Sequence, residues 1–265
     1  MRILLTNDDG MGAPGLAALE RIAAALSDDV WVIAPETEQS GASHSLTLHL
    51  PLRYREVAPR RFAVQGTPTD SVVMAVMHIL KNEKRPDLVL SGVNRGSNIA
   101  DDVTYSGTVA GAMEGTVLGI PSIALSQALS NPPSAPVNWK TAVTLAPDLI
   151  RRLVSVGWPA DVLLNINFPG VTADQVMGVE VTVQGQRDQS LLAVDARVDT
   201  RGVPYYWLAF ERRFINPPDG TDLNAIAAAR ISVTPLHLNL THSEAREALA
   251  GALGAPKAQI AKTKP

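Results

Sequence analysis

The segment Asn7-Asp8-Asp9-Gly10 places two adjacent carboxylates directly after a short apolar run, Ile3–Thr6. Such a run followed by a turn is typical of a buried parallel strand, and open α/β sheets bind ligands at the carboxyl ends of their strands. Neighbouring carboxylates repel each other, so both stay ionised only where a cation or several hydrogen-bond donors stabilise them. The pattern favours a metal site, although a solvated Asp-Gly turn would also account for it.

A second polar loop, Gln39–Ser45, follows the apolar run Val30–Ala34 and its closing Pro35. If these runs are parallel neighbouring strands, Ser40 and Gly41 lie beside the acidic turn. Hydroxyl groups there are suited to a hard cation or to phosphate oxygens. A flexible surface loop is the alternative. His44, in the same loop, is a candidate for proton transfer.

The most informative segment runs from Ser91 to Thr108. It leaves a predicted buried strand, supplies Asn94 and Asn98, and ends in Ser106-Gly107-Thr108 at the start of a predicted helix. Backbone N–H groups and hydroxyls at a helix start attract anions. The segment lacks the Gly-Lys-Ser/Thr of a P-loop and the dinucleotide-binding glycine pattern. A simple helix cap explains Ser106, but it explains the whole polar cluster less well.

Periodicity predicts an α/β fold that is built from β-α-β units around a mostly parallel sheet. The expected strands are 3–6, 30–34, 87–91, 122–126 and 162–169. The expected helices start at Pro14, span 67–80 with a capping box of Thr67 and Asp70, and cover 108–118 and 138–154. Residues 36–66 are expected to form a loop and short antiparallel edge strands, among them the alternating run Ser45–Leu50.

The pattern changes beyond Gly170, so residues 1–170 are predicted to form the core that carries the site. Residues 171–265 are predicted to form a second segment that partly packs back on that core. Within it, 179–184 and 203–210 are expected to pair as an extended β-hairpin. A strand is predicted at 231–236 and an amphipathic helix at 243–253.

Composition narrows the classes of function. The 265 residues are 46% hydrophobic, and the net charge of −3 argues against binding to nucleic-acid polymers, which requires a basic surface. The absence of cysteine excludes thiolate chemistry and Cys-ligated zinc and is compatible with a reducing cytosol. We find neither a signal peptide nor an apolar run long enough to cross a membrane. A cytoplasmic protein without membrane attachment is therefore expected.

Taken in order, these motifs resemble the SurE family, the survival-protein-E nucleotidases, over nearly the whole chain. The first half carries the most specific matches, which are 2–10, 34–35 with 40–43, 66–70, 91–98 and 105–109. Segments 164–169, 205–207 and 232–236 also fit. The match loosens after Gly170 and around Asn239, where some relatives carry an acid, so no role is transferred to that region.

The resemblance implies a divalent-metal-dependent phosphatase of nucleoside 5'- and 3'-monophosphates, in some members also of short polyphosphate. It implies that Asp8, Asp9, Ser40 and Asn94 hold one cation per subunit, with Mg, Mn or Ca preferred because every ligand is oxygen. It also implies a three-layer, Rossmann-like core and a homodimer, or a homotetramer, formed by exchange of the C-terminal segment, so the hairpin and the C-terminal helix within 171–265 are expected to serve in oligomerisation. Asn98, Ser106, Gly107, Thr108 and Gly41 are the residues expected at the phosphate.

Two questions about the chemistry stay open at this point. The attacking group is either a water activated by a carboxylate, which we favour, or Asp8 itself, which makes Asp8 and Asp9 the candidate catalytic residues. A non-catalytic nucleotide-binding module and a structural or chaperone-like dimer are the rival hypotheses, because a fold does not fix a function.

Overall fold

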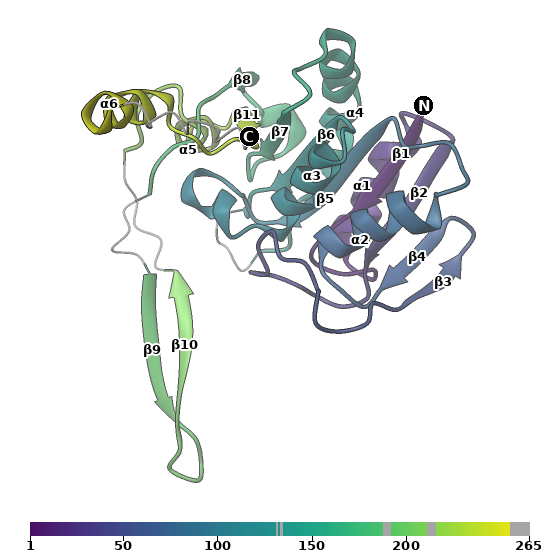
Figure 1. Ribbon diagram of the computed structural model, residues 1–265, viewed down its shortest axis with the longest axis horizontal. Helices are drawn as coiled ribbons and strands as arrows, with labels where there is room; N and C mark the ends of the chain where they lie inside the picture. The colour runs from purple at the N-terminus through teal and green to yellow at the C-terminus, as the bar shows by residue number, and fades with distance from the viewer. Residues whose placement is uncertain (131, 133–134, 188–191, 211–215, 255–265) are drawn as a thin grey trace, which may run out of the picture.

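The computed structural model describes residues 1–130, 132, 135–187, 192–210 and 216–254. Its core has three layers, with a central sheet between two layers of helices (Figure 1). This arrangement confirms the predicted α/β class. Among the described residues, no helix is both long and apolar enough to span a membrane.

The central sheet has the strand order β3-β4-β2-β1-β5-β6-β7-β11-β8. Pairing is parallel from β4 through β7, while β3 and β11 run antiparallel to their neighbours β4 and β7. Strands β1 and β7 are buried along their whole length, as expected for strands covered on both faces. The bounds are β1 Arg2–Thr6, β2 Asp29–Pro35, β3 Tyr54–Ala58, β4 Arg61–Val64, β5 Leu88–Arg95, β6 Ser122–Gln127, β7 Val162–Phe168, β8 Val179–Val181 and β11 Ile231–His237.

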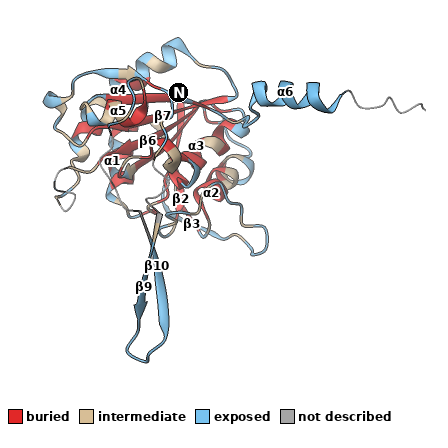
Figure 2. Ribbon diagram, turned by 90° about the vertical axis from the view of Figure 1, so that its left-hand side faces the viewer, coloured by how far each residue is buried: buried red, intermediate tan, exposed pale blue. Residues whose placement is uncertain are grey.

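Helices α1 (Pro14–Ala24) and α4 (Trp139–Val156) pack together on one face of the sheet. Helices α2 (Pro68–Met74) and α3 (Gly107–Val117) pack together on the other face. Separate apolar clusters lie beneath the two layers, and Figure 2 shows the buried residues concentrated in the sheet and the helix faces turned toward it. The predicted positions of these helices are confirmed, with boundary shifts of one or two residues.

The predicted capping box at the start of α2 is also confirmed. The hydroxyl of Thr67 accepts the backbone N–H of Asp70 at 3.1 Å, and Asp70 Oδ2 accepts the backbone N–H of Thr67 at 2.9 Å. Asp70 also accepts bonds from the backbone N–H and the hydroxyl of Thr47. The helix then continues through a π-helical turn, η1 (Ala75–Ile79), and so ends close to the predicted Leu80.

The prediction of a strand at Ser45–Leu50 was wrong. This segment has no strand partner, and its leucines point into solvent, with Leu48 exposed to 85%. Alternation indicates a strand only where one face can be buried against the sheet, and Thr47 is instead held by Asp70. The edge strands of the region are β3 and β4, which pair antiparallel to each other as expected.

The predicted pairing of 179–184 with 203–210 was also wrong. The first segment forms β8, which joins the central sheet parallel to β11. The hairpin instead pairs β9 (Leu192–Val198) with β10 (Pro204–Phe210), so the strand predicted at 203–210 is present but has a different partner. It projects from the body of the protein in both views (Figures 1 and 2).

Helix α6 (Ser243–Leu253) has the predicted bounds, but none of its residues is buried. Three short elements were not predicted, namely α5 (Asp222–Ala227) and the 3-10 turns η2 (Ala100–Thr104) and η3 (Ala173–Gln175). All three are too short to show a helical period. Of these, η2 lies in the polar segment that leads to α3.

Candidate functional site

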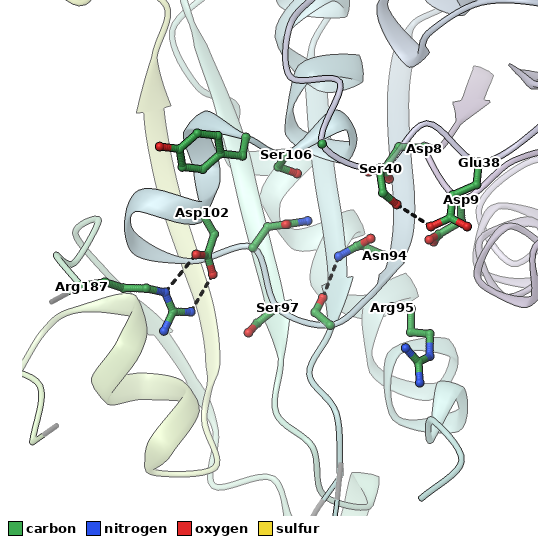
Figure 3. A pocket seen from close by; sticks show the side chains of 14 residues that line it. Asp8, Asp9, Glu38, Ser40, Asn94, Arg95, Ser97, Asp102, Ser106 and Arg187 are labelled. Carbon is green, nitrogen blue, oxygen red and sulfur yellow. Dashed lines mark hydrogen bonds and ion pairs between the residues drawn. The ribbon is translucent and has the colours of Figure 1, made fainter. Parts of the chain in front are cut away.

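The candidate site lies where the strand order of the sheet reverses. Strand β1 pairs with β2 on one side and with β5 on the other, and the helices that follow β1 and β5 cover opposite faces. The loops after these strands diverge there and leave a crevice at the carboxyl edge of the sheet. A cavity of about 400 Å³ occupies this position (Figure 3).

Asp8 is the most deeply buried of the four predicted metal ligands. Its residue is 5% exposed, and its Oδ1 accepts a hydrogen bond from the hydroxyl of Thr108 at the start of α3. Burial raises the pKa of Asp8, while the hydroxyl and backbone N–H of Thr108 act in the opposite direction. The carboxylate at the end of β1 therefore contacts the first turn of α3, which fixes its position against the helix start.

Gly107 makes this contact possible. A Cβ atom at Gly107 would lie 2.7 Å from Cβ of Asp8, which is closer than two non-bonded carbon atoms can approach each other. One turn later, a Cβ at Gly111 would lie 2.8 Å from Oγ of Ser91 on β5. Glycine at these positions lets α3 lie close against the strands, so its first turn reaches the acidic loop.

Asp9 faces the cavity and is only partly buried. Its pKa is raised to about 6, first because burial penalises the charged form and second because Asp8 is an adjacent negative charge. The turn itself is held by Asn7, whose side-chain amide donates to the carbonyl of Gly10 at 3.0 Å. Both carboxyl groups are therefore costly to ionise unless a cation binds beside them.

We expect the metal-free protein to become more stable as the pH falls from 7.5 toward 5. The folded-state pKa of Asp9, about 6, lies above the usual value of an exposed Asp, so the folded state binds the proton more tightly than the unfolded state. The ionised Asp9 therefore lowers the free energy of unfolding at pH values well above 6, and this destabilisation is lost as Asp9 is protonated below pH 6.

Thermal unfolding of the wild type and of Asp9→Asn in chelator measures this effect. The variant should be the more stable protein at pH 7.5, and the difference should shrink toward pH 5. A difference in stability that stays constant from pH 7.5 to pH 5 would contradict the raised pKa of Asp9.

The loop after β2 supplies Ser40 and Gly41, as predicted, and both line the cavity. The backbone N–H of Gln39 donates to the carbonyl of Asp8 at 2.8 Å, which joins this loop to the acidic turn. The hydroxyl of Ser40 donates to Glu38 at 2.9 Å, so Ser40 and a third carboxylate lie together near Asp9 (Figure 3).

Asn94 and Asn98 also line the cavity, at the end of β5 and in the loop beyond it. The side-chain amide of Asn94 donates to the carbonyl of Gly96 at 3.0 Å, which leaves its oxygen on the side of Asp9 and Ser40 (Figure 3). Asn98 is held by the two core asparagines of β7, Asn165 and Asn167, through its backbone groups.

The start of α3 differs in detail from the expectation. Ser106 is the N-cap residue: its hydroxyl accepts the N–H of Val109 at 3.0 Å, and its side chain reaches the cavity. Gly107 and Thr108 lie behind it, against Asp8. The hydroxyl of Thr108 is fully buried in this contact, so in this structure it positions Asp8 and is not directed into the cavity.

The donor set at this end of the cavity suits a hard cation. Among the described residues, no three His, Asp, Glu or Cys side chains are placed to hold one metal ion together, so a bound cation would depend on the neutral oxygens of Ser40 and Asn94 as well as on the two aspartates. In the whole cavity, four carboxylates face two guanidinium groups. A phosphate dianion would meet net repulsion there unless a cation were bound.

Four charged residues of the cavity were not singled out from the sequence, namely Glu38, Arg95, Asp102 and Arg187. Arg187 comes from the segment after β8, and its Nε and Nη2 donate to the carboxylate of Asp102 at 3.0 and 2.6 Å. No sequence signal links two residues that are 85 positions apart. Glu38 and Arg95, by contrast, directly flank the predicted motifs and could have been included.

The histidines lie elsewhere. His44 pairs with Glu114 of α3 at 2.9 Å, and it is not among the side chains that line the cavity. His237 ends β11 with an exposed side chain, and it too does not line the cavity. Among the described residues, neither is therefore placed to transfer a proton in this cavity.

Comparison with known proteins agrees with this architecture. The family model described as survival protein SurE matches residues 3–191. A protein of Parvibaculum lavamentivorans named 5'-nucleotidase SurE is 63% identical, with 96% of this chain and 91% of the relative covered. Proteins of the same name from Caulobacter vibrioides and Methylorubrum extorquens are 60% and 61% identical, covering 96% and 91% of this chain and 97% and 94% of theirs.

The crystal structure of the SurE protein from Aquifex aeolicus superposes with a TM-score of 0.83 at 38% sequence identity. The match covers 96% of this chain and all of the other. A family match over more than half of the sequence, close relatives over nearly its full length and a solved structure with the same fold together show that this chain belongs to the SurE family.

Proposed function

We propose that this chain is a divalent-metal-dependent 5'-nucleotidase, which hydrolyses nucleoside 5'-monophosphates to nucleoside and phosphate. The observation that carries the proposal is the convergence of Asp8, Asp9, Ser40 and Asn94 on one cavity beside the start of α3. The relatives at 60–63% identity bear the name 5'-nucleotidase, which supports the same reaction class. Nucleoside 3'-monophosphates and short polyphosphate are proposed as further substrates.

The cation is held in this proposal by Asp8, Asp9, Ser40 and Asn94. When bound, it supplies a Lewis acid that offsets the negative charge of the phosphoryl group. Magnesium, manganese or calcium fits a site built only from oxygen atoms better than zinc does. The raised pKa values of Asp8 and Asp9, which come first from burial, support the assignment, since a nearby cation favours the ionised form of a buried carboxyl group.

The phosphate is held in this proposal against the α3 side of the cavity. Ser106 and Asn98 contribute polar side chains, Gly41 leaves room for close approach, and the first turn of α3 at Gly107 and Thr108 contributes its dipole. The hydroxyl of Thr108 acts in this scheme on Asp8. Thr108 would then contribute only its backbone N–H group to phosphate binding.

Asp9 is the better candidate for the carboxylate that takes the proton from the attacking water. It faces the cavity, whereas Asp8 is buried and has one oxygen occupied by Thr108. The contact with Thr108 also makes attack by Asp8 itself the weaker proposal, because a nucleophilic carboxylate must reach the phosphorus atom in line with the leaving oxygen.

The test is phosphate release from a panel of nucleoside 5'- and 3'-monophosphates and short polyphosphate, with added manganese or with chelator. Release with manganese and its loss in chelator is the expected result. Hydrolysis that survives thorough chelation would refute the metal requirement. Nucleotide binding without any hydrolysis would favour the non-catalytic binding module.

We further propose that the chain associates as a homodimer or homotetramer through the β9–β10 hairpin and α6. An isolated two-stranded hairpin is marginally stable in water, yet this one exposes apolar side chains such as Val194, Trp207 and Leu208 to 59–74%. Light scattering should give two or four times the chain mass of 28.2 kDa. Replacement of Trp207 and Leu208 by serine should lower that mass, and a monomeric wild type would contradict the proposal.

A further inference from the structure

Ser40 is the proposed metal ligand that lies on the most exposed part of the site, in the loop after β2. Its hydroxyl donates to Glu38, two positions earlier in the same loop, and both residues are exposed. A bond within the loop cannot fix Ser40 relative to Asp8. The position of Ser40 therefore depends on the contacts that hold the loop on either side of it.

On the N-terminal side, the loop is joined to the acidic turn, because the N–H of Gln39 donates to the carbonyl of Asp8 at 2.8 Å. On the C-terminal side, the hydroxyl of Ser43 donates to the carbonyl of Thr104 at 2.7 Å. Ser43 has a φ angle of 54°, which residues other than glycine rarely adopt. Such a backbone conformation persists only where neighbouring contacts hold it.

The next residue, His44, joins the loop to α3. Its Nε2 lies 2.9 Å from Oε2 of Glu114, and an ionised carboxylate only accepts hydrogen bonds, so the imidazole donates. The side chain of Glu114 is 10% exposed and that of His44 is 35% exposed. Among the residues that the structure describes, His44 is the only partner of this carboxylate. A carboxylate buried to this degree is costly without a donor, which favours the loop position that supplies His44.

Helix α3 thereby holds segments that carry two of the four proposed ligands. Its first turn contacts Asp8 through Thr108, and further along it contacts the loop of Ser40 through Glu114 and His44. The helix packs on β5 and β6 and is a rigid element of the core. The separation between Asp8 and Ser40 is therefore set by one helix.

The chain beyond His44 is attached to a different helix. The hydroxyl of Thr67, at the start of α2, donates to the carbonyl of Ser45 at 2.8 Å, and Asp70 accepts the N–H of Thr47 at 3.0 Å. These contacts do not involve α3. They keep the loop attached when the contact with Glu114 is removed, so we expect its loss to displace Ser40 without unfolding the protein.

We propose that His44 and Glu114 are positioning residues that fix Ser40 for the cation, given the metal site proposed above. Neither side chain lines the cavity, so the pair acts through the loop and touches neither the cation nor the substrate. Groups that orient metal ligands from outside the coordination sphere change metal affinity by about 10-fold to 100-fold when they are removed.

The test measures the dissociation constant of manganese by titration calorimetry, without nucleotide. His44→Ala and Glu114→Ala should each raise this constant by on the order of 10-fold. His44→Gln should restore most of the affinity, because its side-chain amide N–H can donate to Glu114. His49→Ala is the matched control, since His49 is an exposed histidine of the same segment, and it should keep the wild-type affinity.

A double-mutant cycle with Ser40→Ala shows whether the pair acts through Ser40. Ser40→Ala alone should weaken manganese binding, and adding His44→Ala should then cause little further loss. A general loosening of the fold would instead add its effect to that of Ser40→Ala. If His44→Ala fails to fold because Glu114 is left buried without a donor, His44→Ala/Glu114→Gln replaces it, with the same expected loss of affinity.

Three results would overturn the inference. The first is an unchanged manganese affinity in His44→Ala and Glu114→Ala, which would leave the nucleotidase proposal standing; a lower kcat at that unchanged affinity would assign His44 to proton transfer instead. The second is full additivity of His44→Ala and Ser40→Ala. The third is a wild type that binds no manganese, which would overturn the proposed metal site as well.

Discussion

Replacing Asp8 with asparagine is expected to lower kcat/KM for nucleoside monophosphates by on the order of 10³-fold or more, the size typical of losing a group essential to the chemistry. Asparagine keeps the shape of the side chain, and its oxygen still accepts the bond from Thr108. The variant loses only the negative charge that would hold the cation. Phosphate release at saturating manganese measures the effect.

The same variant should be at least as stable as the wild type when no metal is bound. Burial raises the pKa of Asp8, so its ionised form is unfavourable in the folded protein at neutral pH. Thermal unfolding in chelator would show this. Asp148→Asn, on the exposed surface of α4, is the matched control and should change neither quantity. Activity of Asp8→Asn within tenfold of the wild type would contradict the role of Asp8.

Replacing Gly107 with alanine should reduce activity by about 10²-fold, although the added methyl group carries no chemistry. The new Cβ would lie 2.7 Å from Cβ of Asp8, so the carboxylate or the start of α3 must move. A displacement of about 1 Å in an active site commonly has an effect of this size. Overpacking at such a contact also costs about 1–3 kcal/mol of stability.

The measurements are kcat/KM with manganese and the free energy of unfolding in denaturant. Gly251→Ala is the matched control, because a Cβ at that position of α6 meets no atom within 4 Å. Alanine is the better helix former there, and we expect no loss of stability. Wild-type activity in Gly107→Ala would show that the contact between α3 and Asp8 does not position the carboxylate.

Local sequence signals were sufficient where an element is stabilised by its own residues or by a fully buried environment. The capping box at Thr67 and Asp70 is such a case, since both partners lie within one turn. The buried strands and the terminal helix Ser243–Leu253 were predicted for the same reason. Alternation in Ser45–Leu50 misled because periodicity alone does not show whether a neighbouring strand exists.

The β9–β10 hairpin shows that strand-like segments can be recognised from the sequence while their pairing partners cannot. Val179–Val181 and the stretch that begins at Leu192 both have strand-like composition. Composition alone therefore does not show that the first pairs with β11 and the second with β10. Pairing between strands depends on which edges are open after the core has formed. That information is held in no single segment of the chain.

The amino-acid sequence by itself determined the class of fold and half of the polar residues that line the cavity, beginning with Asp8 and Asp9. These residues follow buried strands, and parallel strands bring their carboxyl ends to one edge. Only the tertiary structure decided that Thr108 holds Asp8 and that Arg187 and Asp102 complete the far end of the cavity. Those contacts join residues 85 to 100 positions apart, so they arise from packing and leave no local pattern in the sequence.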